Sequence, residues 1–191
     1  MALLGGRHRT AAAVVSALAL LAGAPQVNHA SSEYTLKAAF LYNFARFVTW
    51  PDDAFASEES PLLIGIVGED PFGTDLDEVI ADKTVHDRPL QVWRIRNLAK
   101  AHRCHVLFIS FVDVPSIQEV LRLLKGRSVL TVGDAEGFTD QGGMIEFFTQ
   151  EKTIRFEING DAAEKADLKI SSKLLRLGRA AGEGSPSSAP R

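Results

Sequence analysis

The sequence predicts an α/β fold: a mostly parallel sheet flanked by helices on both faces, with a C-terminal antiparallel hairpin. Continuous apolar runs at 62–68 and 105–110 are typical of parallel strands that are covered on both faces. An amphipathic segment separates the second run from a further strand at 128–133, which indicates a right-handed strand–helix–strand unit. Two alternating segments, 144–148 and 153–158, flank a short polar turn and predict the hairpin.

Length and charge indicate one mildly acidic globular domain. The chain has 191 residues, of which 46% are hydrophobic and 24% charged, and its formal net charge is −3. Such a balance argues against a nucleic-acid-binding protein, which would show an excess of basic residues on one face. We expect the domain to span 31–180, and the Gly-, Ser- and Pro-rich segment 181–191 to be a disordered tail.

The first thirty residues have the pattern of a secretory signal peptide. Arg7 and Arg9 precede an apolar stretch at 10–24, which is shorter than the roughly 20 residues of a membrane-spanning helix. We expect cleavage after Ala30 or Ser32; a retained N-terminal anchor is the alternative. No N-glycosylation sequon is present, so a bacterial periplasm is the simplest destination.

The segment 33–48 predicts a helix that is apolar over a wider arc than a surface helix needs. Ser32 is the expected N-cap, and Pro51 is expected to end the helix after Trp50. We expect the helix to pack on the sheet and to use the rest of its apolar arc at a subunit or partner interface. One stripe of the helix consists of Leu36, Phe40, Phe44 and Phe47.

The remaining elements follow from the same signals. Residues 74–83 have weak helical character, and the alternating residues 90–95 predict a strand. Residues 113–125 form the clearest helix, with Pro115 in the first turn and Gly126 after the last. Two short helices are expected near the C-terminus, one capped by Asp161, and one that returns Leu174, Leu175 and Leu177 to the core.

No catalytic motif is present, so we expect neither enzyme activity nor a cofactor. The sequence has no serine-hydrolase elbow, zinc-protease motif or phosphate-binding loop. His102, Cys104 and His105 include good zinc ligands, but no second cluster supplies the four ligands of a structural site. We therefore expect no metal, and we expect Cys104, the one cysteine of the chain, to be a free thiol.

The turn "GEDPFG" at 68–73 is a candidate ligand crevice. It follows a strand, at the edge of the sheet where α/β folds often bind ligands, and its candidate lining residues are Glu69, Asp70 and Phe72. The two carboxylates would repel a phosphate. The alternative interpretation is a tight turn built from Asp, Pro and Gly.

The hairpin provides a candidate partner-binding face. Alternation directs Ile145, Phe147, Ile154, Phe156 and Ile158 to the core. The opposite face mixes aromatic, acidic and basic side chains, as protein-binding surfaces do; an ordinary solvated face with cross-strand ion pairs is the alternative. The candidate contact residues are Met144, Glu146, Phe148, Arg155 and Glu157.

Seven motifs follow one another along the chain: "EYTLKAAFLYNFARFVTWP", "GEDPFG", "CHVLFIS", "LTVGDAEGF", "GGMIEF", "RFEIN" and "ISSKLLRL". In this order they resemble the YfiR family of periplasmic proteins, from about Glu33 to Arg179. The resemblance implies a periplasmic regulator that binds the periplasmic part of an inner-membrane diguanylate cyclase and inhibits it, lowering cyclic di-GMP and biofilm formation. It also implies sequestration by an outer-membrane lipoprotein, and homodimers.

The chain departs from this family at its cysteines. Relatives commonly have a partner for Cys104 in the strand before the turn, where this chain has Gly65, and a second pair near 142–144 is absent. Control by an internal disulfide is therefore not expected, and pairing of Cys104 between chains is an open alternative. The second functional hypothesis is a periplasmic small-molecule-binding sensor module, which would use the crevice at 69–73.

Overall fold

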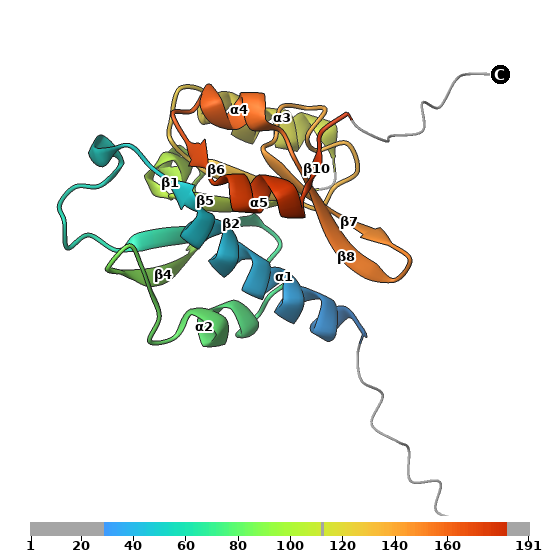
Figure 1. Ribbon diagram of the computed structural model, residues 1–191, viewed down its shortest axis with the longest axis horizontal. Coiled ribbons are helices and arrows are strands. Elements are labelled where there is room, and N and C mark those ends of the chain that lie inside the picture. The colour runs from blue at the N-terminus through green and yellow to red at the C-terminus, as the bar shows by residue number, and fades with distance from the viewer. Residues whose placement is uncertain (1–28, 112, 183–191) are drawn as a thin grey trace, which may run out of the picture.

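The computed structural model describes residues 29–111 and 113–182 (Figure 1). The predicted signal peptide, up to residue 28, and residues 183–191 of the predicted tail lie outside the described part. In that part, no helix is long and apolar enough to cross a membrane.

One eight-stranded sheet runs in the order β10-β8-β7-β6-β5-β2-β4-β3. The five strands from β4 through β2, β5 and β6 to β7 are parallel neighbours, whereas β8 is antiparallel to β7 and β3 to β4. This confirms the predicted parallel sheet with a C-terminal hairpin. The strands are β2 (Leu62–Gly68), β3 (Thr84–Val85), β4 (Arg88–Ile95), β5 (Val106–Ser110), β6 (Leu130–Gly133), β7 (Ile145–Gln150), β8 (Thr153–Ile158) and β10 (Arg179–Ala180).

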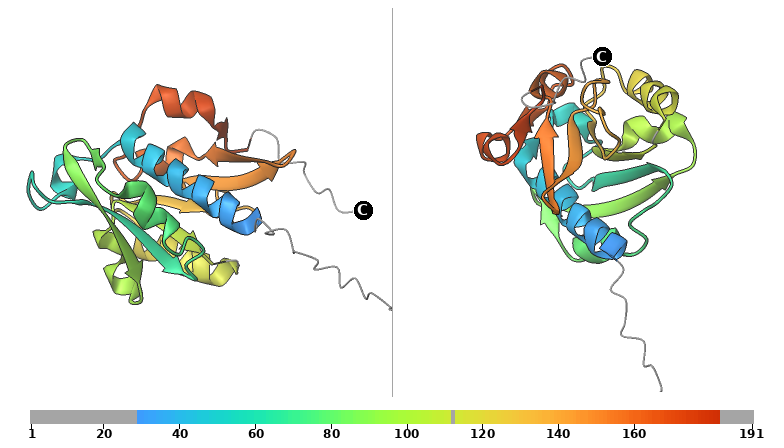
Figure 2. Two further views of the ribbon diagram at one scale, coloured as in Figure 1. Left: turned by 90° about the horizontal axis from the view of Figure 1, so that it is seen from below. Right: turned by 90° about the vertical axis from the view of Figure 1, so that its right-hand side faces the viewer.

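Helices cover both faces of the sheet, as Figure 2 shows for α1 and α3. Side chains of β5 alternate between two core clusters: Val106 and Phe108 join α1 and α2, and Leu107 and Ile109 join α3. The helices are α1 (His29–Phe47), α2 (Asp75–Ile80), α3 (Val114–Leu123), α4 (Gly160–Glu164) and α5 (Ser172–Leu177), with 3-10 turns η1 (Asp52–Ala54) and η2 (Leu98–Arg103).

The limits of α1 differ from the sequence-based expectation at both ends. The helix begins at His29, so Ser32 lies inside it and is not its N-cap. It ends at Phe47, because Val48 and Thr49 form β1 (Val48–Thr49) and pair with β9 (Lys169–Ile170). This small antiparallel sheet attaches the end of the first helix to the C-terminal part of the chain.

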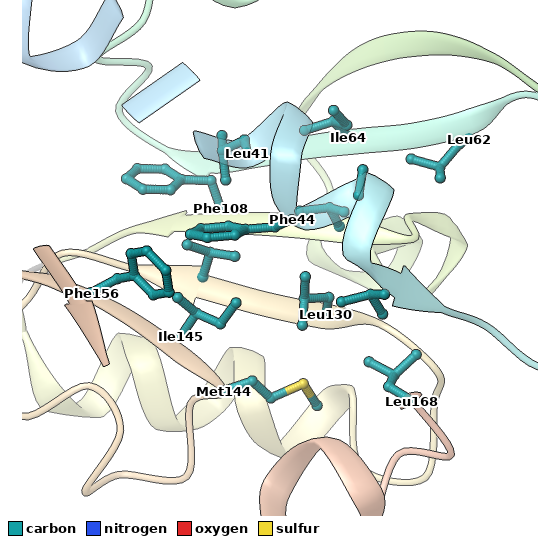
Figure 3. Packing of buried hydrophobic residues seen from close by; sticks show 14 of the residues in the cluster. Leu41, Phe44, Leu62, Ile64, Phe108, Leu130, Met144, Ile145, Phe156 and Leu168 are labelled. Atoms are coloured by element: carbon teal, nitrogen blue, oxygen red, sulfur yellow. The ribbon is translucent and has the colours of Figure 1, made fainter. Parts of the chain in front are cut away.

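The aromatic stripe of α1 packs on the sheet only in part. Phe44 is fully buried, and its ring contacts those of Phe147 and Phe156 at centroid distances of 5.6 and 5.0 Å. Figure 3 shows Phe44 among core residues of the central strands. Phe40 is half-buried and Leu36 is exposed, so the use of this part of α1 at an interface stays a prediction.

Two expectations for the C-terminal helices are wrong. Asn159 caps α4, because its side chain accepts the N–H of Ala162 at 3.0 Å, and Asp161 lies inside the helix. In α5, Leu174 is buried, but Leu175 and Leu177 are 47% and 64% exposed. A helix of six residues has room for few core-facing positions, so the other leucines point to solvent.

Candidate functional site

The candidate partner-binding face of the β7–β8 hairpin is only partly exposed. Met144, Glu146 and Glu157 are buried, whereas Phe148 is half-buried and Arg155 is exposed. The candidate contact residues are thus not equally accessible: Phe148 and Arg155 reach the surface, and the other three do not. Binding of a partner by this face stays a prediction.

The two buried glutamates hold other parts of the chain against the hairpin. Glu146 and Glu157 lie opposite each other in the β7–β8 register. The Glu146 carboxylate accepts the backbone N–H groups of Gly137 and Thr139 at 3.1 and 3.0 Å. The Glu157 carboxylate accepts the Thr139 hydroxyl and the guanidinium of Arg179, whose Nε lies at 3.1 Å. These hydrogen bonds offset the free-energy cost of removing both carboxylates from water.

Four side chains make up what we call the hairpin surface: Phe148, Arg155 and Leu177, together with Arg179, which is already paired with Glu157. Arg155 lies opposite Phe148 in the β-register. The Arg179 guanidinium lies 4.3 Å from the centre of the Phe148 ring, and Leu177 precedes Arg179 by two residues. An aromatic ring, two arginines and an exposed leucine are the composition of an interface core.

The turn after β2 is held closed by a hydrogen bond within it and by Arg94 of the neighbouring strand β4. Asp70 accepts the Phe72 N–H at 2.9 Å and pairs with Arg94 Nε at 2.7 Å, and Arg94 also reaches Asp77 at 2.6 Å. Phe72 is buried and meets the ring of Phe108 edge-on. This geometry matches the tight-turn interpretation. Ligand binding here stays a prediction, and Glu69 is the one candidate of the three that is exposed.

A buried lysine, which no sequence motif indicated, connects α1 to the carboxyl end of β6. Lys37 Nζ lies 2.7 Å from both Asp134 Oδ2 and Glu33 Oε1, and the Tyr34 hydroxyl donates to Asp134 at 3.0 Å. Burial acts to lower the pKa of Lys37, but its hydrogen bonds to Asp134 and Glu33 outweigh that effect and raise the pKa. The ammonium group is well partnered, so we interpret this cluster as a structural tether.

His105, at the start of β5, is a second buried polar group with defined partners. Its Nδ1 accepts the N–H of Leu63 at 3.0 Å, so its Nε2 carries the proton that is donated to the Ala54 carbonyl at 3.1 Å. The Phe55 ring stacks on the imidazole at 4.2 Å. Burial lowers the pKa of His105 to about 4, and the charge of Arg88 acts in the same direction.

Comparison with known proteins identifies the family to which this chain belongs. The profile of the family described as YfiR/HmsC-like matches residues 34–179, from α1 to β10. The chain belongs to the YfiR/HmsC-like family. YfiR-like proteins are a family of periplasmic regulators. No curated protein matches the chain.

One similar solved structure is a conserved domain protein from Vibrio cholerae O1 biovar El Tor. It is 15% identical, with a TM-score of 0.45, and the match covers 62% of this chain. The same match covers 54% of the Vibrio protein, so this chain spans about half of that protein's length.

The departure of this YfiR-like chain at its cysteines has a clear structural setting. Cys104 is 2% exposed, and burial raises the pKa of its thiol to about 12, so the thiolate is scarce at neutral pH. A Cβ atom at Gly65 would lie 2.5 Å from Cys104 Sγ. Position 65 therefore faces the thiol directly, and the buried thiol is poorly placed to pair between chains.

Among the residues that the structure describes, no group of three or more His, Cys, Asp or Glu side chains is arranged to hold a metal ion. His102 is exposed, whereas Cys104 and His105 are buried immediately before β5. The three residues of the "HRCH" segment that suggested zinc are thus not brought together as ligands.

Proposed function

We propose that this chain is an exported regulator that binds the periplasmic part of an inner-membrane diguanylate cyclase and holds it inactive. The observation that carries the proposal is the YfiR/HmsC-like match over residues 34–179, which takes in almost all of the folded chain. Inhibition lowers cyclic di-GMP and biofilm formation. An outer-membrane lipoprotein that sequesters the regulator relieves the inhibition.

The hairpin surface is the proposed contact with the cyclase. Leu177 is 64% exposed, and the exposed Arg155 lies opposite Phe148 in the β-register, so a partner gains apolar burial and charge-assisted hydrogen bonds on this surface. Inhibition requires that the regulator bind the inactive cyclase more tightly than the active one, because equal affinities would shift nothing.

Deletion of the gene is expected to raise cellular cyclic di-GMP, and restoration of the wild-type gene to reverse the rise. Restoration with the double variant Arg155→Glu/Leu177→Asp should fail, since both changes remove attraction at the proposed contact and leave the core intact. The measurement is cyclic di-GMP by mass spectrometry, together with pull-down of the cyclase's periplasmic domain.

A matched control places the same two kinds of change elsewhere. Val114 and Arg127 are exposed and lie away from the hairpin, at α3 and the loop that follows it, so Val114→Asp/Arg127→Glu should restore repression. If deletion leaves cyclic di-GMP unchanged while a cyclase is expressed, the regulator proposal fails and the small-molecule sensor becomes the better hypothesis. If Arg155→Glu/Leu177→Asp restores repression as the wild-type gene does, the hairpin surface is not the contact.

The proposal includes a homodimer, with the exposed part of the α1 stripe as its interface. Light scattering on the purified mature chain gives the mass directly. A monomer at all concentrations of the wild-type chain would remove the dimer from the proposal and leave the cyclase contact standing.

A further inference from the structure

We propose that the groove between α3 and α4 binds a small amphipathic anion: a carboxylate with an aliphatic body and an N–H donor. The inference does not rest on the regulatory function, nor on the turn at 68–73. It rests on three properties of the groove: its shape, its unpaired charges and one unsatisfied amide oxygen.

The groove has the size and floor of a small-molecule site. Its volume is about 540 Å³, within the range of ligand pockets, and it is lined by the C-terminal end of α3, the start of β6 and α4. Both helices are labelled at the top of Figure 1. The floor consists of Leu124, Val129, Met144 and Ala166, all buried. No aromatic ring lines the groove, so a flexible aliphatic chain fits this floor better than a stacked ring.

The rim of the groove is positively charged. The described residues that line it include three cations and no carboxylate: Arg122 in the last turn of α3, Lys125 just after that helix, and Lys165 just after α4. Within the described part of the chain, none of these three cations takes part in an ion pair. Three cations around an apolar floor create a positive potential that favours an anionic head group.

Gln141 adds a hydrogen-bond acceptor. Its Nε2 donates to the Gly137 carbonyl at 3.2 Å, but its Oε1 is buried and has no donor among the residues that the structure describes. A buried acceptor without a partner is unfavourable, because it has lost its hydrogen bond to water and gained none. The terminal torsion of a glutamine is soft, so the amide can turn toward the groove and accept an N–H from a ligand.

These three features together describe an N-acyl amino acid or a molecule of the same chemistry. The acyl chain covers Leu124, Val129 and Met144, the carboxylate meets the cations, and the amide N–H satisfies Gln141. A plain fatty acid lacks the donor, and a cationic amphiphile has the wrong charge for the rim.

The test is a calorimetric titration of the mature chain with three probes of equal chain length. N-octanoylglycine has every feature, N-octanoylsarcosine lacks the N–H, and octyltrimethylammonium reverses the charge. We expect N-octanoylglycine to bind below about 1 mM, the sarcosine analogue to bind about tenfold more weakly, and the cation not to bind. Equal binding of the anion and the cation would mean nonspecific partitioning, and no binding of N-octanoylglycine would overturn the proposal.

Variants locate the site. Lys125→Glu/Lys165→Glu should weaken N-octanoylglycine at least about tenfold, whereas Arg127→Glu, a charge reversal outside the groove lining, should leave it unchanged. Gln141→Leu should abolish the preference for the glycine over the sarcosine probe, because the acceptor is gone. If the groove variants bind as the wild type does, the site lies elsewhere and the proposal is wrong; unchanged circular dichroism establishes that each variant is folded.

Discussion

Gly65→Cys is expected to form a disulfide with Cys104 and to stabilise the oxidised chain by about 4 kcal/mol relative to its reduced form. The two positions enclose a loop of roughly 40 residues, and closing it removes chain entropy from the unfolded state. The geometry is suitable because a Cβ at position 65 would lie 2.5 Å from Cys104 Sγ, too close for a non-bonded contact and near enough for a covalent bridge.

Gly65→Ala is the control that separates the bond from the added atom. An alanine Cβ meets Cys104 Sγ, and Leu107 Cδ1 at 2.9 Å, so this variant should lose about 1–3 kcal/mol through overpacking. Urea unfolding with and without reductant measures both effects, and thiol titration counts the free cysteines. Two reactive thiols in the unfolded, oxidised Gly65→Cys chain would contradict the expected bond.

The second large effect is a loss of stability in mild acid that depends on His105. The pKa of this imidazole is about 4 in the folded chain and near 6.5 when unfolded, so the unfolded state binds more protons between these values. The stabilisation is therefore complete above about pH 6.5 and declines as the pH falls toward 4, by up to about 3 kcal/mol. A proton on Nδ1 would face the Leu63 N–H and break that hydrogen bond.

His105→Gln tests this assignment without a change of burial. A glutamine side chain offers an acceptor for the N–H of Leu63 and a donor for the carbonyl of Ala54, but it does not titrate. The free energy of unfolding in urea should fall between pH 7 and 5 in the wild type, and clearly less in the variant. Parallel pH profiles for the two chains would show that carboxylates and other histidines govern the acid response.

The strands could be predicted from the sequence because parallel strands that are covered on both faces consist almost entirely of apolar residues. "LLIGIVG" has no polar side chain and "HVLFIS" has an apolar centre, and they contain β2 and β5, two neighbouring strands at the centre of the sheet. The pairing of β1 with β9 could not be predicted, because a strand of two residues has no periodicity and because the residue opposite Thr49, Lys169, lies 120 positions further along the chain.

The candidate site was harder to predict for a related reason. Alternation correctly placed Glu146 and Glu157 on the face opposite Phe147 and Phe156, but it does not say what covers that face. The covering groups come from Thr139, in the loop before the hairpin, and from Arg179, at the far end of the chain. Lys37 was unpredictable for the same reason. In the sequence it resembles a surface residue of a helix, and only the fold brings Asp134 next to it.

The buried glutamates also couple the unfolding of a loop to that of the hairpin. The loop segment around Gly137 and Thr139 has no strand partner of its own, yet its N–H groups end on a carboxylate inside the hairpin. Its release would leave buried charge uncompensated at Glu146, so the loop cannot fray by itself at small cost. These two amides should exchange their hydrogens together with those of β7 and β8, as one cooperative unit, and not at the rate of an ordinary surface turn.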